Sequence, residues 1–295
     1  MQKDLLSLIA GKSPAFSKGQ KRIAEYILDH YDKAAFMTAS KLGATVGVSE
    51  STVVRFASIL GFDGYPGLQR ALHELIRNKL TAVQRIEVTT EQLGSDDVLD
   101  KVLGLDIEKI RRTLEETSRE DFDRAVDAIV KAQNIYIIGA RSASALARFL
   151  AYYFGLIFPG VKLVHTTSSS EMFEQIMRIG ENDVLIGISF PRYSRMTAKA
   201  FDFASARKAQ VIAVTDSEVS PIARAAGCLL LARSDMVSFV DSLVAPLSLI
   251  NALIVAVGLR KRQEISATFE RLEEIWDKYN VYEKSGDAGE ETAET

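Results

Sequence analysis

The sequence predicts an α/β protein with a separate all-α domain, in which a helical bundle precedes a doubly wound domain on a five-stranded parallel sheet. Its 295 residues allow two domains of roughly 100–200 residues each. Apolar residues recur at helical spacing up to about residue 80, whereas beyond residue 130 short apolar runs alternate with helical segments. Strands that are apolar on both faces indicate a parallel sheet covered by helices on two sides. The runs are Ile135–Ile138, Val161–Val164, Val184–Ile188, Val211–Val214 and Cys228–Leu231.

Two short helices around a tight turn are predicted at residues 38–60. Thr38 can cap the first helix, and Gly47 supplies the positive φ at which that helix stops. Ser49 then opens a second helix, whose apolar stripe is Val53, Phe56, Ile59 and Leu60. This spacing is typical of a helix-turn-helix.

Further helices are predicted on both sides of this motif. A capping box at Ser17 and Gln20 begins a helix over 17–30. After a dense turn at 61–67, an amphipathic helix runs from Leu68 to Leu80. Residues 1–80 are therefore predicted to form one compact helical domain.

The outer face of the second motif helix is polar near its N-terminus, where a recognition helix meets base edges. The predicted base readers are Ser49, Glu50, Ser51, Thr52 and Arg55. Lys18, Lys41 and Arg70 are predicted to contact phosphates. The alternative is an ordinary helical hairpin whose polar face is only solvated.

Charge is distributed unevenly along the chain. The net charge is −3, which argues against a protein that coats nucleic acid non-specifically. Residues 1–80 nevertheless carry 11 Lys and Arg against 7 Asp and Glu, a balance of +4. This balance is consistent with a DNA-binding domain, and equally with a well-solvated one.

The rest of the chain divides by its patterning. Residues 81–97 lack a sustained period and are predicted to be a linker, and the second domain is predicted over 98–282. It opens with a long helix from residue 98, and Ser118 caps the next one, which runs to about Lys131. Two more helices are predicted over 240–257 and 264–279, and residues 283–295 form an acidic tail predicted to be disordered. The stripe of the long helix is Leu99, Val102, Leu103, Ile107, Ile110 and Leu114.

Hydroxyl and guanidinium groups follow three of the predicted strands. Because ligands bind at the carboxyl ends of such strands and helix N-termini attract anions, we predict one anion site built from three loops. Pro221 is suited to the first position of a helix after the fourth strand. The alternative for each serine is a helix cap. The predicted effector residues are Arg141, Ser142 and Ser144, then Ser189, Arg192, Ser194 and Arg195, and finally Ser217 and Ser220.

At this point the sequence resembles the RpiR family of bacterial transcriptional regulators, in which a helix-turn-helix precedes a sugar-isomerase-type (SIS) domain. The resemblance rests on the segments 48–56 and 60–65, and on residues from about 120 to 260. It implies a homodimer or homotetramer that binds operator DNA and responds to a phosphorylated sugar or sugar acid. It also implies that 98–282 is an effector-binding and oligomerisation domain.

The two loops depart from the usual SIS pattern. Arg141 stands where the first loop of that pattern has its second glycine, and Ala143 stands at the usual serine. In the second loop Pro191 and Arg192 replace a Ser-Gly pair. Added arginines and lost backbone freedom predict a more anionic or differently shaped effector, such as a sugar acid or dicarboxylate.

Two other functions compete with this interpretation. A sugar-phosphate isomerase would need an acid/base pair, for which His165 and Glu171 are the candidates near a strand end. A protein that binds sugar phosphates but not DNA would use the helical domain only to dimerise. We expect no catalysis, because a lone histidine after a strand is more often structural and Glu171 can simply favour a helix N-terminus.

Composition excludes several further classes. The chain has one cysteine and three histidines without ligand spacing, so no metal site or cofactor is expected. Cys228 lies in an apolar run and is expected to be buried and inert. No run of 18 apolar residues and no signal-peptide pattern are present, so we expect a cytoplasmic protein without a membrane partner.

Overall fold

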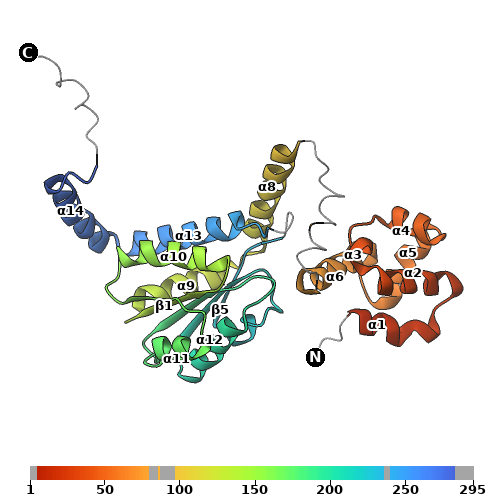
Figure 1. Cartoon of the computed structure of the whole chain (residues 1–295), viewed down its shortest axis with the longest axis horizontal. Helices are drawn as coiled ribbons and strands as arrows, with labels where there is room; N and C mark the ends of the chain where they lie inside the picture. Colours follow the sequence, from red (N-terminus) through yellow and green to blue (C-terminus); the bar gives the residue numbers. More distant parts are fainter. Residues whose placement is uncertain (1–4, 80–85, 87–96, 236–239, 283–295) are drawn as a thin grey trace, which may run out of the picture. The chain divides into compact units, whose positions relative to one another are not determined.

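The computed structural model describes residues 5–79, 86, 97–235 and 240–282. The predicted linker falls outside the described residues except at Ile86 and Asp97, and the predicted tail 283–295 falls outside them entirely. The chain divides into two compact units, the first reaching Arg111 and including the loop segments 191–193 and 234–243. Figure 1 shows a helical bundle near the N-terminus and, in the second unit, a sheet with helices.

The helical bundle buries one continuous apolar core. Phe16 and Phe56 meet edge to face with ring centroids 5.2 Å apart, and Ile23, Leu42 and Val53 are fully buried around them. Its helices are α1 (Leu5–Lys12), α2 (Lys18–Asp29), α3 (Tyr31–Ala34), α4 (Ala39–Val46), α5 (Glu50–Leu60) and α6 (Gly64–Lys79).

Three predictions about the bundle need correction. Helices α1 and α3 were not predicted, because each is short, with eight and four residues. Helix α6 begins at Gly64 rather than Leu68, since Pro66 is its third residue, where a helix has no intrahelical acceptor for the missing N–H. Ile59 is 44% exposed, so the buried stripe of α5 is Val53, Phe56, Ala57 and Leu60.

The predicted α/β fold class is confirmed. Five parallel strands form one sheet in the order β2-β1-β3-β4-β5. Helices α9, α10 and α13 cover one face of the sheet, and α11 and α12 cover the other (Figure 1). The strands are β1 (Ile135–Gly139), β2 (Val161–Val164), β3 (Val184–Ile188), β4 (Gln210–Thr215) and β5 (Cys228–Leu231).

The helices of this part of the chain largely follow the prediction, with one exception. After β4 the predicted helix at Pro221 is absent from the described residues, and a 3₁₀ turn, Ala223–Ala225, takes its place. The helices are α8 (Val98–Glu116), α9 (Arg119–Lys131), α10 (Ala143–Gly155), α11 (Ser169–Ile176), α12 (Arg195–Ala206), α13 (Val244–Arg260) and α14 (Arg262–Lys278).

Helix α8 faces the opposite way from the expected one. Its predicted apolar stripe is largely exposed, with Leu99 at 71% and Ile107 at 60%. Its buried side chains are polar instead, namely Lys109, Thr113 and, just past the helix, Thr117. Hydrogen bonds and ion pairs rather than apolar burial therefore attach this helix.

Among the described residues, no single helix has the length and apolar character needed to cross a membrane. Helices α13 and α14 meet that test only when taken together, and they are bent by 96° at their junction.

Candidate DNA-reading helix and effector site

The first helix of the helix-turn-helix, α4, is capped at both ends. Thr38 Oγ1 accepts a hydrogen bond from the Lys41 N–H at 3.1 Å, which starts α4 as predicted. Gly47 ends α4 with a φ of 69°, in the left-handed region that favours glycine. The guanidinium of Arg22 donates to the Gly47 carbonyl, so this arginine supports the turn.

The start of α5 carries a network of hydroxyl groups. Ser49 precedes α5 as predicted, but its side chain does not cap the helix. Its hydroxyl lies 2.9 Å from those of Ser51 and Thr52 instead. Arg55 Nε donates to the Ser51 carbonyl at 3.2 Å. Serines and arginine are thus held together on one face of the helix.

The predicted base readers share the outer face of α5. Glu50, Ser51 and Arg55 are exposed, and Thr52 is half-buried. Val54, which sequence reasoning left out, is 38% exposed beside them; its place one residue before Arg55 on the non-buried side was the available signal. Side chains at these positions can reach base edges and, through the valine, a thymine methyl group.

The predicted phosphate contacts lie on three helices. Lys18 opens α2, Lys41 lies in the first turn of α4 and Arg70 lies on α6. All three are exposed. Such cations at the surface of a bundle can fix its position on a phosphate backbone without reading sequence.

The carboxyl ends of β1, β3 and β4 lie side by side at one end of the sheet. Gly139 of β1 pairs with Ile188 of β3, and Ile188 pairs with Val214 of β4. The loops that follow therefore leave the sheet at the same level. The strand order reverses between β1 and β3, which is where open parallel sheets have their binding crevice.

The loop after β1 is tightly built. A Cβ at Gly139 would lie 2.5 Å from the Ala143 carbonyl oxygen, so no larger residue fits there. Arg141 has a φ of 56°, the conformation that the glycine of the usual pattern would favour. Arg141 and Ser142 are exposed, whereas the Ser144 hydroxyl donates to the Arg141 carbonyl at 2.6 Å.

In the loop after β3 the serines have structural partners. Ser194 Oγ caps α12 by accepting from the Thr197 N–H at 3.2 Å. Ser189 is buried, and its Oγ accepts from the Ser194 N–H at 3.3 Å. Arg192 and Arg195 are exposed. The guanidinium groups of this loop are therefore more available to a ligand than its hydroxyls.

The loop after β4 is anchored to its neighbour. Thr215 Oγ1 donates to the Ser189 carbonyl at 2.7 Å, which joins the ends of β3 and β4. Ser217 Oγ accepts from the Val219 N–H at 3.3 Å. Ser220 is fully buried, and among the described residues its hydroxyl has no hydrogen-bond partner.

The two candidate catalytic residues lie after β2, at the edge of the sheet. His165 is exposed, and its backbone N–H donates to Gln175. The Glu171 carboxylate accepts a hydrogen bond from the Thr166 hydroxyl at the start of α11. Both residues thus have a local setting that needs no acid/base role.

A pocket of about 600 Å³ lies at the amino ends of β3, β4 and β5, opposite the strand ends of the proposed effector site. It is lined by residues of both charges, among them Arg124, Asp127 and Lys131, and by Cys228. Burial raises the pKa of the Cys228 thiol, which keeps it protonated. In the described part of the chain, no group of three or more His, Cys, Asp or Glu side chains is placed to hold a metal ion.

Two family models match this chain. A helix-turn-helix domain of the rpiR family covers residues 3–79, and a SIS domain covers residues 128–256. The chain belongs to the rpiR family. The chain is also 24% identical over 276 residues to the HTH-type transcriptional regulator HexR of Pseudomonas aeruginosa. This match spans 92% of this chain and 95% of that protein.

Solved structures agree with the fold of this rpiR-family chain. The sugar isomerase domain of an RpiR transcription factor from Sphaerobacter thermophilus has a TM-score of 0.58 and 27% identity, over 61% of this chain and 99% of that one. The NanR protein of Vibrio vulnificus, solved in complex with ManNAc-6P, has a TM-score of 0.57 and 22% identity, over 93% and 98%. The likeness to NanR shows the fold.

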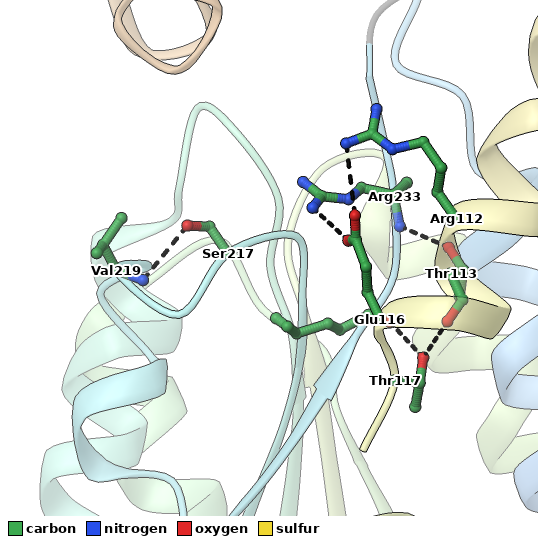
Figure 2. A network of polar contacts seen from close by, with 8 residues as sticks. Arg112, Thr113, Glu116, Thr117, Ser217, Val219 and Arg233 are labelled. Carbon is green, nitrogen blue, oxygen red and sulfur yellow. Dashed lines mark hydrogen bonds and ion pairs between the residues drawn. The ribbon is translucent and has the colours of Figure 1, made fainter. Parts of the chain in front are cut away.

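One charged cluster of the rpiR-family chain was missed in the sequence. Arg233 follows β5 and contacts Glu116 at the end of α8 (Figure 2). The signal was available, because Arg233 comes two residues after a strand, as Arg141 does, but only the ends of β1, β3 and β4 were considered.

Proposed function

We propose that this chain is a DNA-binding transcriptional regulator whose affinity for operator DNA is controlled by a phosphosugar or sugar acid. The observation that supports the proposal most is the outer face of α5, where Glu50, Ser51 and Arg55 are exposed on a helix-turn-helix with a capped, glycine-stopped turn. A SIS domain on the same chain supplies a place for the signal.

The effector site is proposed at the carboxyl ends of β1, β3 and β4. Arg141, Arg192 and Arg195 are exposed there and can bind a phosphate or carboxylate bidentately. The ManNAc-6P complex of NanR supports a phosphosugar as the class of ligand. Three arginines and the loss of the usual Ser-Gly pair favour a strongly anionic member of that class, such as a phosphorylated sugar acid.

We propose that the regulator acts in the cytoplasm as a homodimer or homotetramer. Two copies of α5 would then enter successive turns of the major groove, about 34 Å apart. Effector binding would alter the spacing of the two helical domains through the segment 81–97 and α8. No catalytic step is proposed, because Glu171 is engaged by Thr166 and His165 lies exposed at an edge strand.

DNase footprinting on the DNA upstream of the chain's own gene tests the DNA-binding role. We expect protection of two half-sites one helical turn apart, and no protection at any salt concentration would refute the role. Calorimetry against sugar phosphates, sugar acids and neutral sugars tests the effector class, and a preference for neutral sugars would contradict it. Isomerase turnover that is abolished by His165→Ala or Glu171→Gln would overturn the non-enzymatic assignment.

A further inference from the structure

The carboxylate of Glu116 lies between two guanidinium groups. Arg112 Nη2 is 3.6 Å from Glu116 Oε1, and Arg233 Nη2 contacts Glu116 Oε2 directly. The side chain of Arg233 is only 20% exposed, so its charge is partly desolvated. Figure 2 shows both arginines pointing at this one carboxylate. Two converging guanidinium groups are the arrangement that proteins use to bind phosphate and carboxylate ligands.

The cluster of Arg112, Glu116 and Arg233 lies at the carboxyl ends of the strands, where the effector site is proposed. Thr215 of β4 pairs with Leu231 of β5, so Ser217 and Arg233 each come two residues beyond a paired position. Figure 2 shows the loop that carries Ser217 on the same side of the strands as the cluster. Arg233 Nε is buried and has no acceptor among the described residues, so one donor of this guanidinium is unused.

The same cluster attaches the end of α8. The Arg233 N–H donates to Thr113 Oγ1 at 2.9 Å, and Thr117 Oγ1 lies 2.8 Å from the Leu231 carbonyl oxygen. Each such bond contributes only about 1 kcal/mol net, because water can replace the partner. Since the apolar side chains of α8, such as Leu114 at 59% exposure, face away, little apolar burial holds this turn in place.

We propose that Arg112 and Arg233 form a binding site for a second acidic group of the effector, besides the one proposed to bind at Arg141, Arg192 and Arg195, and that Glu116 occupies this site as a built-in competitor in the free protein. A phosphate offers more acceptor oxygens to two guanidinium groups than one carboxylate does. When it binds, Glu116 is displaced into water and the last turn of α8 loses its ion pair with Arg233. Because α8 follows segment 81–97, which leads to the helical bundle, this release would carry the signal. The inference rests on the proposed function, namely that an effector binds at the carboxyl ends of these strands.

The first experiment measures the binding of inorganic phosphate to the full chain by calorimetry, so it does not involve DNA. Glu116→Gln removes the competing charge and should tighten phosphate binding roughly tenfold, which is about 1.4 kcal/mol. The matched control is Glu108→Gln, because Glu108 pairs with Arg111 at 3.1 Å on the exposed side of the same helix. Glu108→Gln should leave phosphate binding unchanged. Equal binding by the two variants would overturn the proposal.

The second experiment uses the unaltered protein, so it does not depend on the folding of a variant. Hydrogen exchange is measured in phosphate and in chloride at equal ionic strength. Amides 112–117 should exchange several-fold faster in phosphate, and those of α9 should not change. Identical exchange in both salts would refute the displacement of Glu116. Either failure would leave the footprinting result, and hence the regulator function, untouched.

Discussion

The guanidinium of Arg22 donates a hydrogen bond to the carbonyl of Gly47 at 3.2 Å, which ties α2 to the turn between the two motif helices. A Cβ at residue 47 would lie 2.6 Å from Arg22 Nη2, so a side chain there would displace this guanidinium from the turn. The turn therefore depends on glycine for two reasons, its positive φ and this close approach.

Gly47→Ala should lower the free energy of unfolding of the helical bundle by about 1–2 kcal/mol, because alanine adds backbone strain and displaces Arg22. Gly11→Ala is the control. Gly11 lies inside α1, and a Cβ at this residue would meet nothing within 4 Å, so alanine should be neutral or stabilising there. Urea denaturation of both variants measures the difference, and equal stability would contradict this account of the turn.

Tyr65 anchors α6 beneath the motif. Its hydroxyl donates to the Met37 carbonyl at 2.7 Å, and burial raises its pKa from 10.0 to about 12. Tyr65→Phe should cost about 1 kcal/mol at neutral pH. Because the folded-state pKa is the higher one, this contribution is complete below pH 10 and is lost as the pH rises towards 12.

Unfolding free energies of the wild type and Tyr65→Phe at pH 8 and pH 11 check this linkage. The difference between the two proteins should shrink at the higher pH. A constant difference would show that the tyrosine does not titrate with the predicted shift.

Arg141 should show opposite effects on stability and binding. Its φ of 56° is costly for arginine, so Arg141→Gly should raise the stability of the sheet domain by about 0.5–1 kcal/mol. The same change removes an exposed cation from the proposed effector site and should weaken the binding of sugar phosphates. Thermal denaturation and calorimetry measure the two effects. Arg148→Ala, on the exposed side of α10, is the charge-matched control and should leave binding unchanged.

The strands and the motif could be predicted from the sequence because their signals are local. The five apolar runs form the five strands. Helix α4 begins after the capping residue Thr38 and ends at Gly47, which takes the positive φ that glycine favours. The orientation of α8 could not be predicted, because periodicity marks an apolar face without saying what covers it. Its buried side is chosen by distant partners, such as Arg233 for Glu116, that only the folded chain brings together.

The same limit applies to the candidate sites. The position of Arg141 and Arg195 at strand ends follows from the chain order. By contrast, Ser194 caps α12 and the Ser144 hydroxyl turns to the Arg141 carbonyl, which sequence alone leaves undecided between cap and ligand contact. Hydroxyl groups near the start of a helix form hydrogen bonds with backbone groups, as Ser194 and Ser144 do. The exposed arginines of these loops were therefore the better guide to side chains that remain available to a ligand.

Arg55 separates base reading from phosphate attraction. Its side chain lies along α5, where Nε donates to the Ser51 carbonyl at 3.2 Å. This hydrogen bond restricts the orientation of the guanidinium group. Arg55→Ala should cost about 1–3 kcal/mol, or roughly 5- to 150-fold, in operator affinity and relax the preference at one base pair, since arginine most often reads a base through a bidentate contact to guanine. Arg70→Ala should instead weaken binding to all sequences alike and lower the salt slope by about one. Fluorescence anisotropy on operator and scrambled DNA across a KCl series distinguishes the two, with Arg262→Ala on α14 as the control. If Arg55→Ala changed only the salt slope, the reading face of α5 would have to be reassigned.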